Sequence, residues 1–221
     1  MDIPTFSGVL LLSYILGSIP SGLIFVRVFK GQDLREIHSG RTGGTNAMRA
    51  AGFWVGLATT LSDIFKGAGA VWIASALLPG STWLKVLAPV AAIVGHNYSI
   101  FLISRTPEGR WRIGGGAGGA PCLGGALGLW APSILIIFPL GFLILFGLGY
   151  ASVTTLSIAA LSFIIFTITA LIHVTPWHFV IYSLLAEGLL IWALRPNIRR
   201  LLDGTERMIG WRAKRLKTQG S

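Results

Sequence analysis

Residues 39–49 form a polar segment in which glycines alternate with side chains that bind anions. Glycines let the backbone turn several N–H groups toward one ligand, and hydroxyl and amide side chains add further hydrogen bonds. An arginine can hold a phosphate through two parallel hydrogen bonds. The residues concerned are Gly40, Gly43, Gly44, Ser39, Thr45, Asn46 and Arg49. The segment predicts a phosphate-binding loop; the alternative is a flexible, solvated loop, which has a similar composition.

A second glycine-rich segment, residues 114–119, follows Arg105, Arg110 and Arg112. Because it immediately precedes apolar sequence, its N–H groups are expected at the start of a helix, where the helix dipole favours an anion. Two such segments suggest a pair of substrates that carry two phosphates. The alternative is that the glycines only let helices pack closely. The candidate binding residues are Gly115, Gly116, Gly118 and Arg112.

A few ionisable groups interrupt otherwise apolar sequence. Asp63 and Lys66 are three residues apart, so they share one face of a helix, where charges usually face a polar cavity or each other. This spacing suits a functional pair near the first glycine-rich segment and equally a structural ion pair. His96 is either a site residue or a hydrogen-bonded packing residue. Glu187 is a lone acid to which the sequence assigns no role.

The elements that must position these groups are apolar. Of the 221 residues, 53% are hydrophobic and 12% are charged, which leaves too little polar surface to cover a soluble globule. Four stretches contain no Asp, Glu, Lys or Arg, and each is long enough to cross a bilayer, which takes about 20 helical residues. The stretches are residues 3–26, 67–84, 86–104 and 113–186. The chain is therefore predicted to be an integral membrane protein.

The expected fold is all-α and polytopic, with about seven transmembrane helices. Their approximate ranges are 4–27, 54–78, 84–104, 118–132, 134–150, 153–174 and 177–195. The first range lacks the basic start of a cleavable signal, so it is expected to be a retained span. Between residues 118 and 149, Pro132 and Pro139 indicate either a turn between two short helices or a kink in one long helix. No internal repeat is evident.

Charge predicts the orientation of the chain. The formal net charge is +10, and the basic residues gather in residues 27–52, in residues 104–117 and after residue 195. Basic loops face the cytoplasm, so the amino terminus is expected outside and the carboxyl terminus inside. This distribution disfavours a nucleic-acid partner. Residues 1–221 are expected to form one membrane-embedded domain, with residues 195–221 a basic tail that lies along anionic headgroups or only fixes the orientation.

The motifs together resemble those of the bacterial integral-membrane acyl-phosphate:glycerol-3-phosphate acyltransferases, along nearly the whole chain. Residues 17–22 resemble the first-helix signature of that family, and residues 39–49 match its first catalytic motif. Asp63-x-x-Lys66-Gly67 and Gly95-His96 fit in order and spacing. Residues 150–153, with Ser152, and residues 197–206, with Asn197 and Glu206, are similar to later motifs.

Two positions depart from the pattern of this family. Ala117 stands where a phosphate-binding lysine is expected, and Arg110 and Arg112 are the candidates to substitute for it. Leu194 stands where the closing motif has a histidine. Both changes favour an alternative in which the chain is a non-catalytic relative that binds a phospholipid or a phosphorylated metabolite.

The resemblance implies transfer of a fatty acyl group from acyl phosphate to the 1-hydroxyl of glycerol 3-phosphate, which yields lysophosphatidic acid for phospholipid biosynthesis at the cell (inner) membrane. An acyl phosphate is already activated, so positioning and charge stabilisation suffice without a covalent enzyme nucleophile. No cofactor, no metal and no obligatory protein partner are expected besides the two substrates and membrane lipids. A small transporter is a further alternative, favoured by the intramembrane charges and disfavoured by the missing repeat.

The resemblance also assigns roles to residues of this chain. Those expected to be catalytic are Ser39, Arg49 and Asn197. Those expected to bind substrate are Gly40, Gly43, Thr45, Asn46, Lys66, His96, Arg112, Gly115, Gly116, Gly118, Ser152 and Glu206.

Overall fold

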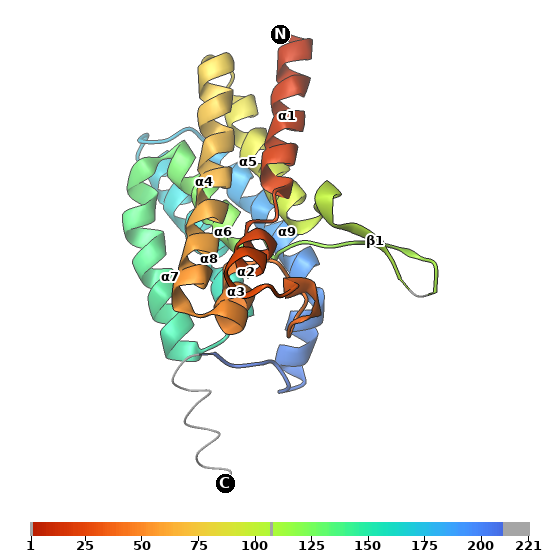
Figure 1. Cartoon of the computed structure of the whole chain (residues 1–221). Helices are drawn as coiled ribbons and strands as arrows, with labels where there is room; N and C mark the ends of the chain where they lie inside the picture. The colour runs from red at the N-terminus through yellow and green to blue at the C-terminus, as the bar shows by residue number, and fades with distance from the viewer. Residues whose placement is uncertain (1, 107, 210–221) are drawn as a thin grey trace.

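A computed structural model describes residues 2–106 and 108–209 as a bundle of helices with one small hairpin (Figure 1). The helices are α1 (Ile3–Ser18), α2 (Ser21–Lys30), α3 (Gly44–Ala51), α4 (Phe53–Leu77), α5 (Thr82–Asn97), α6 (Gly119–Leu129), α7 (Ile134–Leu148), α8 (Ala151–Leu171) and α9 (His178–Leu202). The strands β1 (Ile103–Arg105) and β2 (Trp111–Ile113) pair antiparallel. Short 3₁₀ turns lie at Leu34–Glu36, Ile100–Leu102 and Ala131–Ser133.

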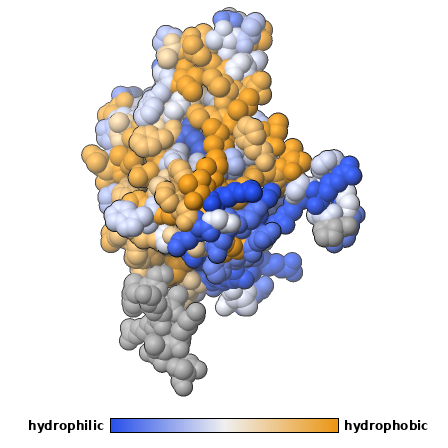
Figure 2. Space-filling view, in the orientation of Figure 1, coloured by the Kyte–Doolittle hydropathy of each residue, from blue (hydrophilic) through white to orange (hydrophobic). Residues whose placement is uncertain are grey.

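Five helical segments of the described chain are long and apolar enough to cross a membrane. They are Ile3–Lys30, Thr82–Leu102, Ala131–Leu148, Ala151–Leu171 and His178–Leu202. Large apolar side chains of α7 point outward, with Leu135 75% and Leu143 64% exposed, as expected for a helix that faces lipid. Figure 2 shows hydrophobic residues over most of the side of the molecule that it displays. Hydrophilic residues gather around the hairpin, the loop before α3 and the end of α9. The prediction of a polytopic, helical membrane protein is confirmed.

The span predicted at residues 4–27 agrees with the apolar segment Ile3–Lys30, but this segment is not one continuous helix. The helix α1 ends at Ser18, and α2 begins at Ser21 after Ile19 and Pro20. Proline has no N–H to donate to the preceding turn, and its ring clashes with the carbonyl four residues earlier, so the helix breaks there. After the break, α2 packs against α3 and α4, which brings the first glycine-rich segment under the bundle (Figure 1).

The span predicted at residues 84–104 agrees with the apolar segment Thr82–Leu102, but its α-helix ends before the segment does. The helix α5 ends at Asn97, and the chain then enters a 3₁₀ turn and the β1–β2 hairpin, which an all-α prediction does not include. In the region between residues 118 and 149, α6 and α7 are separate helices, with Pro132 in the turn between them and Pro139 inside α7. The range predicted as a tail is helical to Leu202, and residues 210–221 lie outside the described residues.

The backbones of helices α4 and α6 are in direct contact. A Cβ atom added to Gly67 of α4 would overlap the carbonyl oxygen of Pro121, and one added to Gly124 of α6 would overlap the carbonyl oxygen of Ile64. Small residues allow membrane helices to approach in this way. The polar residues of α4 are thereby held beside the start of α6, which follows the second glycine-rich segment.

Candidate active site

A cavity of about 260 Å³ lies where α3, α4, α6, α7, α8 and α9 meet the first glycine-rich segment. Its lining has a polar end and an apolar end. The polar end includes Ser39, Arg41, Thr45, Asn46, Arg49, Thr60, Asp63, His96, Ser152, Asn197, Glu206 and Arg207. The apolar end, between α7 and α8, includes Ile137, Phe138, Gly141, Phe142, Leu145 and Ile158. One continuous cavity therefore offers both kinds of surface.

Most residues predicted for the site line this cavity, although they come from segments far apart in the sequence. They are Ser39, Gly43, Thr45, Asn46, Arg49, His96, Gly118, Ser152, Asn197 and Glu206. Gly40, Gly115, Gly116 and Arg112 instead line a neighbouring cavity of about 610 Å³. Lys66 and Arg110 are in the lining of neither cavity. The structure places these residues, while their individual roles stay predictions.

The first glycine-rich segment is held by hydrogen bonds of Asn46, which is 3% exposed. Its side-chain amide donates to the carbonyl oxygens of Ile37 at 3.0 Å and Arg41 at 2.9 Å. The two glycine-rich segments are also joined, because the Thr42 N–H donates to the carbonyl oxygen of Gly115 at 3.3 Å. Asn46 therefore shapes the loop, and the two segments form one structure.

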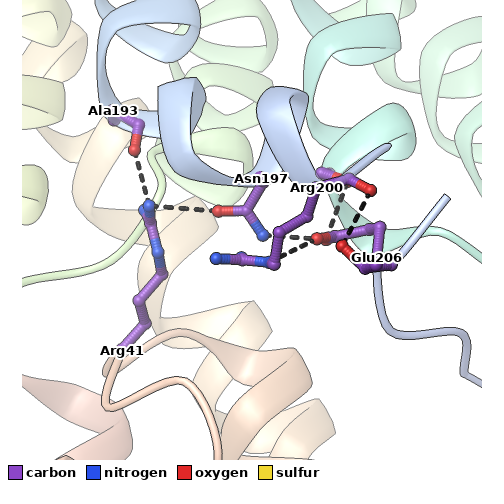
Figure 3. Close-up of polar contacts among 7 residues, drawn as sticks. Arg41, Ala193, Asn197, Arg200 and Glu206 are labelled. Atoms are coloured by element: carbon purple, nitrogen blue, oxygen red, sulfur yellow. Dashed lines mark hydrogen bonds and ion pairs between the residues drawn. The ribbon is translucent and has the colours of Figure 1, made fainter. Parts of the chain in front are cut away.

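Glu206 ties together the ends of α8 and α9. Its carboxylate accepts hydrogen bonds from Ser152 Oγ at 3.1 Å, Asn197 Nδ2 at 2.8 Å and Arg200 Nε at 2.9 Å. Asn197 Oδ1 accepts from Arg41 Nη2 at 3.3 Å, so the network continues to the first glycine-rich segment (Figure 3). Asn197 and Ser152 thus have fixed orientations at the polar end of the cavity.

Positive charge dominates the polar end. Three guanidinium groups line it, those of Arg41, Arg49 and Arg207. Burial is the main cause that lowers the pKa of Arg49, and the charge of Arg207 lowers it further. Burial also lowers the pKa of Arg41, with a smaller contribution from Arg200. Because burial and mutual repulsion oppose these charges, an anion in the cavity would be bound favourably.

Asp63 and Lys66 form a buried ion pair. Lys66 Nζ lies 2.7 Å from Asp63 Oδ1 and donates to the carbonyl oxygen of Ile19 at 2.5 Å. His96 Nδ1 lies 3.7 Å from Asp63 Oδ1. The sequence left two alternatives for Lys66, a functional pair with Asp63 or a structural ion pair. This geometry favours the structural ion pair, because the ammonium group links α4 to the backbone between α1 and α2. No group of three or more His, Cys, Asp or Glu suited to a metal ion occurs within residues 2–106 and 108–209.

Five polar residues of the lining are missing from the sequence prediction: Arg41, Thr60, Thr154, Thr155 and Arg207. Arg41 and Arg207 each adjoin predicted residues, which is a usable signal. The apolar lining has no such signal, because both faces of α7 are apolar and periodicity cannot separate a lipid face from a cavity face.

A family model described as "Glycerol-3-phosphate acyltransferase" matches residues 7–204. Relatives named glycerol-3-phosphate acyltransferase include one from Rubrobacter xylanophilus, 34% identical, with 92% of this chain and 94% of the relative covered. Another, from Parasynechococcus marenigrum, is 38% identical, with 92% of this chain and 90% of the relative covered.

Two solved structures are similar along the chain. The crystal structure of PlsY, an integral membrane glycerol 3-phosphate acyltransferase, in its glycerol 3-phosphate form has a TM-score of 0.77 and 28% identity, and the match covers 93% of this chain and 96% of that one. The lysophosphatidic acid form has a TM-score of 0.76 and 25% identity, and the match covers 93% and 95%.

Proposed function

The chain belongs to the glycerol-3-phosphate acyltransferase family, and from that premise we propose that it transfers an acyl group from acyl phosphate to the 1-hydroxyl of glycerol 3-phosphate. The products are lysophosphatidic acid and inorganic phosphate. The acyl carbon gains a bond to the glycerol oxygen and loses its bond to the phosphate oxygen, and the hydroxyl proton is released.

The observation that carries this proposal is the two-part lining of the cavity. A cationic end with Arg49 and Arg207 suits phosphate groups, and the apolar end between α7 and α8 suits an acyl chain. An acyl phosphate has the same two parts in one molecule. Since both phosphates would lie among the same arginines, the hydroxyl and the acyl carbon are brought together, and positioning of this kind lowers the barrier.

Six of the predicted residues have a role in this reaction. Ser39 and Arg49 bind phosphate, together with backbone N–H groups at the start of α3. Asn197 donates its remaining amide N–H to substrate and Ser152 Oγ accepts a hydrogen bond from substrate, while Glu206 holds both in the required orientation through the bonds described above. Asn46 acts indirectly, because its amide fixes the loop that carries Ser39.

The chain crosses the membrane seven times, with the amino terminus outside and the carboxyl terminus in the cytoplasm, in the cell (inner) membrane. The count adds α4, which is 25 residues long, and the shorter α6 to the five apolar segments. The start of α1 and the end of α9 lie at opposite ends of the bundle (Figure 1). The basic residues around the cavity lie at the end that would face the cytoplasm.

The donor is tested with purified protein, labelled glycerol 3-phosphate, and palmitoyl phosphate or palmitoyl-CoA. We expect equal amounts of lysophosphatidic acid and phosphate with palmitoyl phosphate, and no product with the thioester or when either substrate is omitted. Equal use of the thioester would contradict the proposed donor. Binding without turnover would support the non-catalytic alternative, and uptake of glycerol 3-phosphate into vesicles would support the transporter.

A leucine at Gly141 is expected to change the preferred length of the acyl chain. A Cβ atom at Gly141 would lie 3.7 Å from Ile158 Cγ1, so the substitution fits and fills part of the apolar end. We expect kcat/KM for palmitoyl phosphate to fall about tenfold, with a smaller loss for decanoyl phosphate. Gly147→Leu on the same helix is the control, because a Cβ atom there meets nothing within 4 Å. An equal loss for both donors would argue against an acyl-chain groove.

A further inference from the structure

The side chain of Arg41 crosses the polar end of the cavity, from the first glycine-rich segment to α9 (Figure 3). Its guanidinium donates to the carbonyl oxygen of Gly116 at 3.1 Å, to the carbonyl oxygen of Ala193 at 2.5 Å and to Asn197 Oδ1 at 3.3 Å. All three acceptors are neutral. The ion pairs found within residues 2–106 and 108–209 do not include Arg41. Within these residues no carboxylate is therefore in ion-pair contact with its half-buried guanidinium, and Glu206 contributes only a smaller, longer-range attraction.

The anchors of Arg41 lie beside two residues that line the same cavity. Gly116 immediately precedes Ala117, and Ala193 immediately precedes Leu194. Neither Ala117 nor Leu194 can donate a hydrogen bond or carry a charge from its side chain. These are also the two positions at which the chain departs from the family pattern.

The other candidate cations lie elsewhere. Arg112 lines the neighbouring cavity, and Arg110 is exposed in the hairpin and lines neither cavity. Arg41 lines both cavities, and its guanidinium reaches the carbonyl oxygen just before Ala117. Of these three arginines, Arg41 is the one that lines the cavity of Ala117 and also donates to the residue before it.

We propose that Arg41 binds a substrate phosphate in the active site and provides the cation that Ala117 and Leu194 cannot. The three bonds to neutral oxygens use three of the five N–H donors of the guanidinium, and the remaining donors can bind a phosphate oxygen. The same three bonds fix the group before the substrate arrives, which makes its charge more effective. This inference rests on the proposed function.

The test is replacement of Arg41 combined with relocation of the charge. Arg41→Ala is expected to lower kcat/KM about 100-fold, as for loss of one strong anion donor. Arg41→Ala/Ala117→Lys places an ammonium in the same cavity and is expected to regain at least about tenfold of that loss. The KM that rises in Arg41→Ala, for glycerol 3-phosphate or for acyl phosphate, identifies the phosphate that is bound.

A matched control separates local charge from net charge. Arg41→Ala/Ser104→Lys has the same net charge, but Ser104 is exposed in β1, outside both cavities, so no recovery is expected. If Arg41→Ala does not fold, Arg41→Gln, which keeps an amide donor but has no charge, replaces it in the comparison of Ala117→Lys with Ser104→Lys.

Several results would overturn the inference. One is wild-type turnover in Arg41→Ala. Another is a folded Arg41→Ala/Ala117→Lys protein that is no more active than Arg41→Ala, because Arg41 would then only hold the loop against α9. Recovery by Ser104→Lys equal to that by Ala117→Lys would contradict a local role. Failure of the proposed function is distinct from these results, since the wild-type protein itself would then form no product from acyl phosphate.

Discussion

Arg49→Ala is expected to lower kcat/KM by about 100- to 1,000-fold, which is the usual loss when one preorganised donor to a developing charge is removed. Arg49 lies on α3 and lines the polar end of the cavity with Ser39 and Arg207. A guanidinium bound to phosphate makes two charge-assisted hydrogen bonds, and alanine makes neither. The assay measures formation of lysophosphatidic acid over a range of both substrates.

Arg110→Ala is the matched control for this prediction. It also removes one arginine charge, but Arg110 lines neither cavity, so the activity should stay within about twofold of wild type, as is usual for a surface substitution. Both variants should unfold at the same temperature in detergent, because Arg49 makes none of the ion pairs found in the described ranges 2–106 and 108–209. Wild-type turnover in Arg49→Ala would show that this arginine does not bind a reacting phosphate.

Lys66→Met is expected to destabilise the protein by roughly 3–5 kcal/mol, the usual cost of removing one partner of a buried ion pair. Asp63 is 1% exposed, and without Lys66 its carboxylate would stay buried, with the imidazole of His96 at 3.7 Å as a remaining neighbour. The free energy of unfolding in detergent or the unfolding midpoint measures the effect.

The double variant Asp63→Asn/Lys66→Met distinguishes charge from packing. Once both charges are gone, no uncompensated charge remains, so most of the lost stability should return. If the double variant is less stable than wild type by the sum of the two single-variant effects, the two groups do not interact. Because Lys66 does not line the cavity, the KM values of the folded fraction of the single variant Lys66→Met should not change.

Much of the site could be predicted from the sequence, but for unequal reasons. Ser39 and Arg49 were recognisable because anion-binding side chains stand among glycines within eleven residues. Ser152 and Asn197 lie more than a hundred residues away, and only the resemblance to a family connected them with the loop. Sequence spacing does not show which distant segments lie close together in the fold. In the structure, all four residues line one cavity.

The remaining differences follow from tertiary contacts and from the backbone. The importance of Arg41 depends on its distance to α9, which no local pattern reports. Arg112 was predicted for the same cavity as Arg49, but from the hairpin it lines the neighbouring cavity together with Gly115 and Gly116. Pro20 is itself a clear local signal for a helix break. The prediction of one span instead followed the absence of charged residues around it.

Simultaneous occupancy of one cavity by both phosphates is tested most directly by the kinetic mechanism. Initial rates measured while both substrates are varied should give intersecting lines in double-reciprocal plots. Labelled inorganic phosphate should not enter acyl phosphate when glycerol 3-phosphate is absent, because the acyl group passes directly from one bound substrate to the other. Parallel lines, together with exchange of phosphate in the absence of glycerol 3-phosphate, would mean that the acyl group is first bound covalently to the protein. The two substrates would then not occupy the cavity together.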